Sequence, residues 1–218
     1  MGEFGNGDFE FERRFFVSGL PQELLAEPIP TLIFQSYYLA AEGYAMRVRA
    51  QSSQVLVHLD ENSDPLTVLA DVRDQLDFAG ITVKGPAVNG TRYEVERELD
   101  PEVAAEMIRL GGHQLVKNRY SIWLGSDGWV VDVFGGTNAP LVIAEVERAG
   151  PVTDLEIPGF CVSEVTADRR FANEELSGTP YSTWADSYLR ELELNGPKFL
   201  QGLGRNVFNR AGDQRFEE

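Results

Sequence analysis

The stretch LVIAEVE, residues 141–147, is the starting point for interpreting this 218-residue chain. Most of its residues favour strands, and Glu145 and Glu147 are two positions apart. In a strand, this spacing places both carboxylates on one face and Ala144 and Val146 on the other. The stretch therefore predicts a strand with one apolar face and one acidic face.

The same spacing of charged residues recurs along the chain, with charges of both signs. Residues 9–17 (FEFERRFFV), 44–50 (YAMRVRA) and 91–97 (TRYEVER) each read as a strand with charged residues on one face. The acidic positions in these and similar segments are Glu10, Glu12, Glu94, Glu96, Asp132, Glu145 and Glu147. The basic positions are Arg14, Arg47, Arg49, Lys84, Arg92, Lys117 and Arg119. Acidic and basic positions are thus balanced along the predicted strands.

These charged faces allow two interpretations. They can be the solvated outer faces of ordinary antiparallel strands, which alternate in the same way. Alternatively, they line the lumen of a closed barrel whose apolar outside is covered by helices. The arginine content and the repeated acidic pairs favour the second interpretation, because a solvated face typically mixes Thr, Ser, Lys and Gln. We therefore predict an α+β fold: a closed eight-stranded antiparallel β-barrel, or tunnel, with helices packed on the outside.

Helix signals occur between the predicted strands. Residues 65–76 and 101–110 have apolar positions at helical spacing, and both follow an aspartate that can act as N-cap to a first-turn proline. Thr183 and Asp186 form a capping box for a third predicted helix. We expect residues 1–8 to be a flexible N-terminus, residues 9–195 to form a single tunnel domain, and residues 196–218 to be an accessory tail.

Composition restricts the classes of partner. The formal net charge of −16 argues against a nucleic-acid-binding surface, but an anionic ligand is compatible with basic residues gathered inside. No apolar run approaches the roughly 18 residues of a membrane span. The single cysteine, Cys161, cannot form an internal disulfide and suggests a reducing compartment. We expect a cytoplasmic monomer or homodimer that binds neither nucleic acid nor membrane.

A lumen with charges of both signs suits a polyanion together with a metal ion. Carboxylate pairs offer hard oxygen ligands of the kind that Mg²⁺ or Mn²⁺ prefers. Arginine and lysine bind phosphate oxygens, arginine often through two hydrogen bonds. Metal ions combined with a cationic clamp are a recurring solution for phosphoryl transfer. The pattern therefore favours a triphosphate or nucleotide-like ligand.

The sequence resembles the CYTH superfamily, the triphosphate tunnel metalloenzymes. EFERRF, residues 10–15, is similar to the family's ExExK signature. Further similar segments follow in order through residues 8–176: Tyr38-Leu39, Arg47-Val48-Arg49, Thr82 to Gly85, Arg92 to Glu96, Lys117 to Tyr120, Val131 to Gly135, Leu141 to Glu147, Glu164 to Thr166 and Asp168 to Asn173. The family includes class IV adenylyl cyclases, thiamine triphosphatases and inorganic triphosphatases.

The resemblance implies a role for each charged position. It implies that Glu10, Glu12, Glu145 and Glu147 hold a divalent metal, assisted by Glu94 and Glu96, and Asp132 joins these candidates as a seventh lining acid. It implies that Arg14, Arg47, Arg49, Lys84, Arg92, Lys117 and Arg119 bind phosphates. In some members the signature lysine, paired with a tyrosine that matches Tyr38, is proposed to assist proton transfer. Arg14 and Tyr38 are therefore the candidate catalytic residues.

Two features depart from the family pattern. Arg14 stands where the signature has lysine, and an arginine side chain does not give up its proton. Arg14 is therefore expected to clamp phosphate, with a metal-bound or carboxylate-held water as nucleophile. Residues 51–80 are longer than the connection usual in compact members, so they either cap a tunnel mouth or are neutral.

Three functions are consistent with these residues. The first is metal-dependent hydrolysis of a triphosphate, most simply inorganic triphosphate, by a triphosphatase. The second is an adenylyl cyclase of the class IV type or a thiamine triphosphatase, although no base-recognition pocket is evident in the sequence. The third is a non-catalytic phosphate- or nucleotide-binding module, which the loss of the signature lysine would explain.

Overall fold

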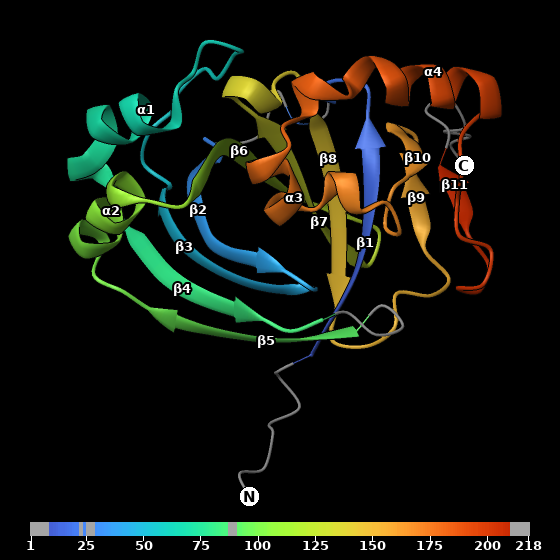
Figure 1. Cartoon of the computed structure of the whole chain (residues 1–218). Helices are drawn as coiled ribbons and strands as arrows, with labels where there is room; N and C mark the ends of the chain where they lie inside the picture. Colours follow the sequence, from blue (N-terminus) through green and yellow to red (C-terminus); the bar gives the residue numbers. More distant parts are fainter. Residues whose placement is uncertain (1–8, 22–23, 25–28, 87–90, 210–218) are drawn as a thin grey trace, which may run out of the picture.

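The fold was analysed in a computed structural model, which describes residues 9–21, 24, 29–86 and 91–209 (Figure 1). The strands are β1 (Phe9–Val17), β2 (Thr31–Ala41), β3 (Tyr44–Ser52), β4 (Phe78–Lys84), β5 (Thr91–Glu98), β6 (His113–Leu124), β7 (Asp127–Phe134), β8 (Val142–Arg148), β9 (Glu156–Pro158), β10 (Cys161–Glu164) and β11 (Val207–Asn209). The α-helices are α1 (Pro65–Val72), α2 (Pro101–Leu110), α3 (Asn173–Gly178) and α4 (Ala185–Asn195). The expected α+β class, with a large antiparallel sheet and few helices, is confirmed.

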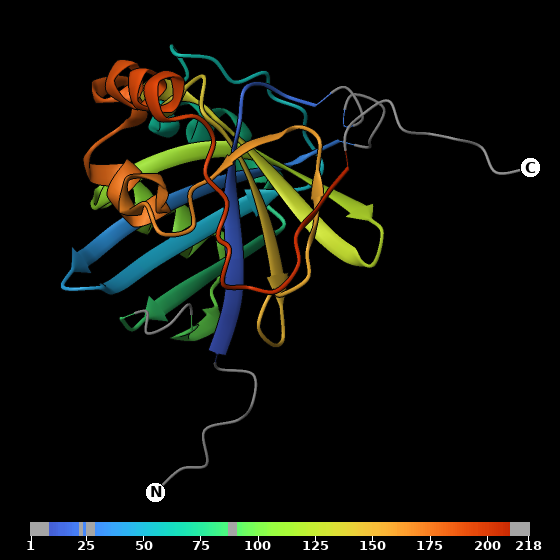
Figure 2. The same cartoon turned by 90° about the vertical axis from the view of Figure 1, so that its right-hand side faces the viewer.

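The main sheet curves around the centre of the molecule. Within the described residues its strand order is β10-β1-β5-β4-β3-β2-β6-β7-β8, and all of its pairings are antiparallel. β1 pairs with β8 from Phe11 to Val17, and its first residues, Phe9–Phe11, also pair with β5. Figures 1 and 2 show the strands bending around a common interior. The period of two therefore sorts the side chains of each strand between this interior and the outside.

The outer face of the sheet is apolar and carries the core. Phe34, Val48 and Val116 point outward from β2, β3 and β6 and pack against Ala105 and Ile108 of α2, and all five are buried. The insert at residues 51–80 joins this layer, because its buried residues Leu59, Leu69 and Val72 belong to the same cluster. The insert therefore covers the outer face of the sheet with α1.

All three predicted helices form, and the caps predicted for the first two match the structure. Asp64 accepts a hydrogen bond from the Thr67 amide at the start of α1, and Asp100 accepts two at the start of α2. The capping box at Thr183 and Asp186 is wrong. Thr183 ends a 3₁₀ turn, and α4 starts after Trp184, with no side-chain cap. The aromatic ring of Trp184 packs edge-on against Phe171 and Tyr181, and this packing accounts for the entry into α4.

The segment that follows α4 crosses the outside of β1 and β10 and ends in β11. β11 pairs in parallel with β9 (Figure 2). The amide of Leu200 donates a hydrogen bond to the side chain of Glu164, at the end of β10. Residues 196–209 are called the C-terminal segment below. In the part of the chain that the structure describes, no helix is both long and apolar enough to cross a membrane.

Candidate active site

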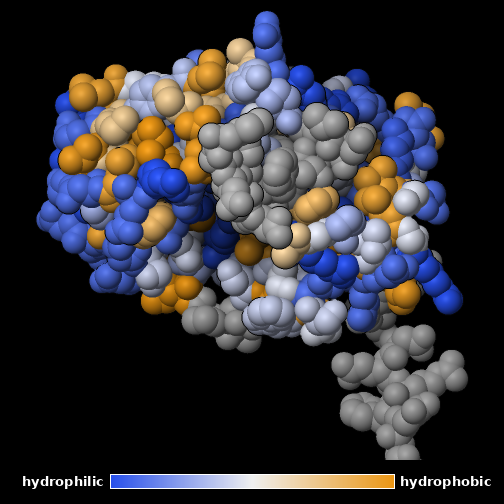
Figure 3. All heavy atoms as spheres, turned by 90° about the horizontal axis from the view of Figure 1, so that it is seen from below, coloured by the Kyte–Doolittle hydropathy of each residue, from blue (hydrophilic) through white to orange (hydrophobic). Residues whose placement is uncertain are grey.

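A charged cavity of about 280 Å³ lies on the inner side of the sheet. Its lining residues come from seven strands and from α3: Glu12, Arg14, Tyr37, Arg47, Arg49, Lys84, Glu94, Glu96, Arg119, Glu145, Glu147, Asn173 and Glu174. Ten of these are charged residues that the strand periodicity singled out. Seen from below, hydrophilic residues predominate on the face of the molecule, with apolar residues scattered among them (Figure 3).

The period of two explains how residues far apart in sequence meet here. Glu12 and Arg14 lie directly opposite Glu147 and Glu145 across the β1–β8 pair. At another pair of strands on the same inner face, Lys84 of β4 lies opposite Glu94 of β5. Opposed residues in an antiparallel pair point to the same face, so the recurrent spacing produces one continuous charged lining.

Ion pairs bridge β3, β4 and β5 on one side of the cavity. An Arg49 amino group lies 2.9 Å from Glu96, and Arg47 lies 3.6 Å from Glu94. Lys84 also pairs with Glu94. Thr82, opposite Glu96 in the ladder, donates a hydrogen bond of 2.8 Å to its carboxylate. These cations are therefore largely neutralised by neighbouring carboxylates.

A second charged group joins β6, β7 and β8. Asp132 accepts hydrogen bonds of 2.7 Å from two nitrogens of Arg119 and one of 2.6 Å from Lys117. Burial opposes ionisation of Asp132, but Arg119 and Lys117 outweigh it and hold its pKa below the usual range. Burial lowers the pKa of Lys117 to about 8, and the positive charge of Arg119 adds to this effect while Asp132 opposes it. Arg119 also lies 3.3 Å from Glu145.

Two predicted ligands lie away from the cavity surface. Asp132 and Lys117 are 1% and 0% exposed and are not among the residues that line the cavity. The oxygens of Asp132 accept hydrogen bonds from Arg119 and Lys117, and the ammonium of Lys117 also donates to Asn173. In the ligand-free protein Asp132 therefore orients Arg119, and the predicted roles of Asp132 in metal binding and of Lys117 in phosphate binding stay predictions.

Tyr38 is also misplaced by the sequence prediction. Its side chain is 38% exposed and its hydroxyl donates to the main-chain oxygen of Met107 in α2, on the outer face. Its neighbour Tyr37 lines the cavity instead, because it lies opposite Arg47 and shares the inward face. Burial raises the pKa of Tyr37 to about 12, so its hydroxyl stays protonated at neutral pH.

Arg14 reaches the cavity from β1. Its terminal nitrogens donate to the main-chain oxygens of Phe171, at 3.2 Å, and Thr166, at 3.5 Å. Among the described residues, the acidic group that pairs with it is Glu12, at 3.6 Å from Nε. Arg14 is thus held mainly by neutral carbonyl groups, whereas Arg49 and Arg119 are held by carboxylates at 2.9 and 2.7 Å.

Three further carboxylates of the lining, Glu12, Glu145 and Glu147, lie on β1 and β8. Burial, together with Asp132, raises the pKa of Glu145. Burial, together with Glu12, raises the pKa of Glu147. Like charges facing one another in this way are relieved by a bound cation, and carboxylate oxygens are the donors that Mg²⁺ and Mn²⁺ prefer. The donor chemistry of Glu12, Glu145 and Glu147 therefore fits a hard divalent metal.

The described side chains do not yet form a compact metal cage. Among them, no three His, Cys, Asp or Glu residues are gathered closely enough to hold an ion. The backbones of Glu10 and Arg92 pair with each other in the β1–β5 ladder, but their side chains lie outside the described part of the structure, as do residues 1–8. The predicted contributions of Glu10 and Arg92 stay predictions.

Two lining residues were missed by the strand pattern. Asn173 and Glu174 belong to α3, which the 3₁₀ turn Arg169–Phe171 brings toward the cavity. Asn173 accepts a hydrogen bond of 3.2 Å from Lys117. Arg169 and Arg170 of the same turn do not line the cavity and pair with Glu175 and with Asp168 and Glu191, respectively. The only sequence signal for Asn173 was its place at the end of the ordered family motifs.

Comparisons with known proteins agree with this picture. The chain is 28% identical over 179 residues to the inorganic triphosphatase of Acetivibrio thermocellus, covering 81% of this chain and 98% of the relative. The crystal structure of the inorganic triphosphatase NE1496 shares the fold, with a TM-score of 0.50 and 24% identity over 77% of this chain and 93% of that one. No family model matches the sequence. The ordered motifs, the charged cavity and the near-complete alignment with the Acetivibrio thermocellus relative together point to the CYTH superfamily, the triphosphate tunnel family.

Proposed function

We propose that this protein is a triphosphatase that hydrolyses inorganic triphosphate in its charged cavity with the help of a divalent metal. The observation that carries the proposal is the lining itself, in which arginines, a lysine and glutamates from six strands face one 280 Å³ space. The relative from Acetivibrio thermocellus is named an inorganic triphosphatase, which supports the same substrate. We further propose that β1, which pairs with both β5 and β8, closes the main sheet into the predicted eight-stranded tunnel.

Phosphate oxygens are bound by the basic residues of the lining. Arg14, Arg47, Arg49, Lys84 and Arg119 are available on the cavity surface, and Arg92 is added from the sequence prediction. Most of these cations are paired with glutamates in the ligand-free protein, so a triphosphate exchanges existing ion pairs for charge-assisted hydrogen bonds. Because the cations are already oriented, little reorganisation is needed when charge shifts onto the leaving phosphate.

Glu12, Glu145 and Glu147 would hold the metal, with Glu10 added from the sequence prediction. A bound Mg²⁺ or Mn²⁺ would neutralise phosphate charge and lower the pKa of a coordinated water. Burial raises the pKa of Glu145 and Glu147, and the negative charge of Glu12 raises both further; a bound cation would relieve this repulsion. Glu94 and Glu96 hold Lys84 and Arg49, so their role is to orient cations.

Arg14 and Tyr37 do not act as bases in this scheme. A guanidinium stays protonated at any physiological pH, so Arg14 contributes charge and hydrogen bonds. Tyr37 also stays protonated, and it faces Arg47 across the β2–β3 pair. We propose that both residues bind and orient the substrate while a water attacks the terminal phosphorus, its bond to the bridging oxygen breaks, and pyrophosphate leaves.

The proposal also covers the domain organisation, the oligomeric state and the location of the protein. We propose that residues 9–195 act as a single domain and that the protein works as a monomer or homodimer. A cytoplasmic location is supported by the single cysteine, Cys161, which is free and buried.

The test is a substrate panel. The purified protein is incubated with inorganic triphosphate, ATP or thiamine triphosphate and with Mg²⁺ or Mn²⁺, and release of orthophosphate and of cyclic AMP is followed. We expect orthophosphate from inorganic triphosphate at the highest kcat/KM and none in the presence of a chelator. Formation of cyclic AMP from ATP would assign a cyclase, and tight triphosphate binding without turnover would assign a binding module.

A further inference from the structure

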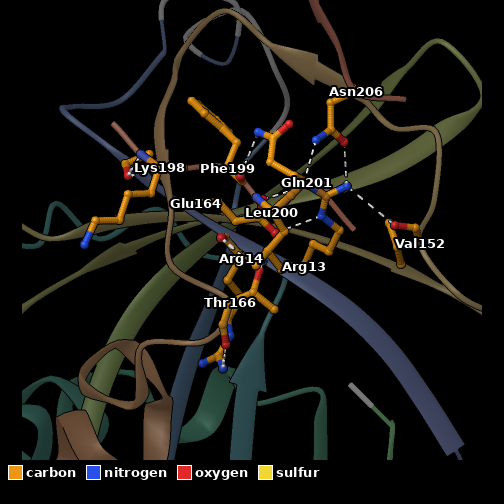
Figure 4. Close-up of polar contacts among 11 residues, drawn as sticks. Arg13, Arg14, Val152, Glu164, Thr166, Lys198, Phe199, Leu200, Gln201 and Asn206 are labelled. Carbon is orange, nitrogen blue, oxygen red and sulfur yellow. Dashed lines mark hydrogen bonds and ion pairs between the residues drawn. The ribbon is translucent and has the colours of Figure 1, made fainter. Parts of the chain in front are cut away.

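A buried polar network lies on the outer side of β1, directly behind the cavity (Figure 4). Arg13, the neighbour of Arg14, points away from the cavity and is 1% exposed. Its guanidinium donates to both oxygens of Glu164, at 2.9 and 2.7 Å, and to Asn206 Oδ1 at 3.0 Å. A buried ion pair with two parallel hydrogen bonds has a defined geometry, so Arg13 fixes the position of Glu164 relative to β1.

The network continues from Glu164 to Arg14 through a single hydroxyl group. Thr166 Oγ1 donates to Glu164 Oε1 at 2.8 Å and accepts a hydrogen bond from the Arg14 amide at 3.1 Å. The same segment also contacts the side chain of Arg14: the main-chain oxygens of Thr166 and Phe171 accept hydrogen bonds from its guanidinium. Residues 164–171 therefore hold Arg14 at both its backbone and its charged head.

We propose that Thr166 is a positioning residue for Arg14 and that the buried Arg13–Glu164 pair holds Thr166 in place. Only the assignment of Arg14 to the triphosphate rests on the proposed function. The hydroxyl of Thr166 hydrogen-bonds both to the carboxylate of the pair behind β1 and to the Arg14 amide. A shift of the 164–171 segment would move the two carbonyl groups that aim the guanidinium into the cavity.

This way of holding Arg14 has an electrostatic consequence. Carbonyl groups fix a guanidinium without cancelling its charge, whereas carboxylates do both. The carboxylate of Asp132 lies 2.7 Å from the Arg119 guanidinium, and that of Glu96 lies 2.9 Å from the Arg49 guanidinium. Among the described residues, the carboxylate that pairs with Arg14 is that of Glu12, at 3.6 Å. Arg14 thus keeps more of its positive charge available for an incoming phosphate.

The C-terminal segment completes the network. The Leu200 amide donates to Glu164 Oε2 at 2.8 Å, and the side-chain amide of Asn206 donates to the Leu200 oxygen at 2.9 Å while its oxygen accepts from Arg13. Figure 4 shows Leu200 and Asn206 gathered with Arg13 and Glu164 on the side opposite Arg14. The segment after α4 therefore covers the Arg13–Glu164 ion pair and forms further hydrogen bonds with both of its side chains.

The test compares Thr166→Val with Thr166→Ser. Valine keeps the shape of the side chain and removes the hydroxyl, whereas serine keeps the hydroxyl. Two readouts are needed: hydrogen exchange of the Arg14 amide by NMR, and KM and kcat for inorganic triphosphate with Mg²⁺. We expect Thr166→Val to speed exchange of that amide and to raise KM about 3- to 10-fold, the value of one neutral hydrogen bond. Thr166→Ser should restore both readouts to near the wild-type values.

Ser163→Ala is the matched control. Ser163 lies on β10 close to Thr166, and its hydroxyl accepts a hydrogen bond of 2.9 Å from the Lys198 amide in the C-terminal segment. This variant loses a contact to the same segment without touching Arg14, so Arg14 exchange and KM should not change. Thr166→Ala supplies a second measurement if the valine variant does not fold.

The outcomes separate the positioning role from the proposed function. The positioning role is overturned if Thr166→Val leaves Arg14 exchange and KM unchanged, or changes them no more than Ser163→Ala does. If the wild-type protein does not hydrolyse triphosphate, the proposed function fails, and the exchange of the Arg14 amide alone then decides the positioning role.

Discussion

Arg119 and Arg14 line the same cavity, but different kinds of group hold them in place. Arg119 is backed by Asp132, a buried carboxylate that it shares with Lys117. Arg14 is backed by the main-chain oxygens of Thr166 and Phe171. The first arrangement fixes a cation by neutralising it, and the second fixes a cation and leaves its charge.

The difference separates stability from function within one lining. Breaking a buried ion pair leaves an uncompensated charge in the interior, so residues behind Arg119 should matter most for folding. Removing a cation held by carbonyls leaves only neutral groups, so Arg14 should matter most for the substrate. Substitutions on both sides of the contrast and one pH series would break or sharpen it.

The largest effect on stability is expected for Asp132→Ala. This change removes the carboxylate that Arg119 shares with Lys117, which is 0% exposed, so the free energy of unfolding should fall by about 3–5 kcal/mol. Urea unfolding measures it. Glu96→Gln, at a side chain 32% exposed, should cost less than about 1 kcal/mol. Equal losses in the two variants would contradict the assignment of Asp132 as a buried structural group.

Arg14→Ala should show the opposite balance. We expect kcat/KM for inorganic triphosphate to fall about 100-fold, because an oriented donor to the phosphate is lost. The free energy of unfolding should change by only about 1 kcal/mol, since the groups left behind are carbonyls. Arg97→Ala, at an exposed arginine of β5 outside the cavity, is the control and should change neither quantity. A large stability loss with unchanged kinetics in Arg14→Ala would reverse the roles.

The pH dependence of stability should report Lys117. Burial lowers its pKa to about 8 from 10.5, so between these values the unfolded chain binds more protons than the folded protein. The unfolding free energy contributed by Lys117 therefore rises with pH in this window, by at most about 1.4 kcal/mol per pH unit. Subtracting the pH series of Lys117→Met isolates this contribution. A difference that stays flat from pH 8 to 10 would show that the pKa of Lys117 is not lowered.

The smallest effect separates the two neighbouring tyrosines. Tyr37→Phe removes a buried hydroxyl that faces the cavity and should raise KM about 2- to 5-fold. Tyr38→Phe removes a hydroxyl that bonds to Met107 on the outer face and should leave KM within error of wild type. Steady-state kinetics on both variants decide between them. A larger effect in Tyr38→Phe would restore the original sequence interpretation.

The inward face of the strands was predictable because strand periodicity alone sorts side chains between two faces. Glu145 and Glu147, Arg47 and Arg49, and Glu94 all line the cavity as their spacing indicated. The α+β class and the first two helices followed in the same way from local patterns and caps.

The remaining site residues depend on tertiary contacts that local patterns do not contain. Asp132 and Lys117 share the inward face, but they sink behind Arg119 because the three charges pair with one another. Tyr37 and Tyr38 are adjacent aromatic residues, and only the pairing of Tyr37 with Arg47 shows which one faces inward. Asn173 and Glu174 reach the cavity through the path of a turn and α3, for which no strand period exists.

The central claim is that carboxylates on β8 support metal-dependent hydrolysis in this cavity. The most direct measurement is orthophosphate release from inorganic triphosphate with Mg²⁺ by the double variant Glu145→Gln and Glu147→Gln. We predict a loss of at least about 100-fold in kcat with a thermal unfolding midpoint close to wild type, because glutamine keeps the shape but removes the anionic ligands. Full activity in the double variant would contradict the claim and place the metal elsewhere.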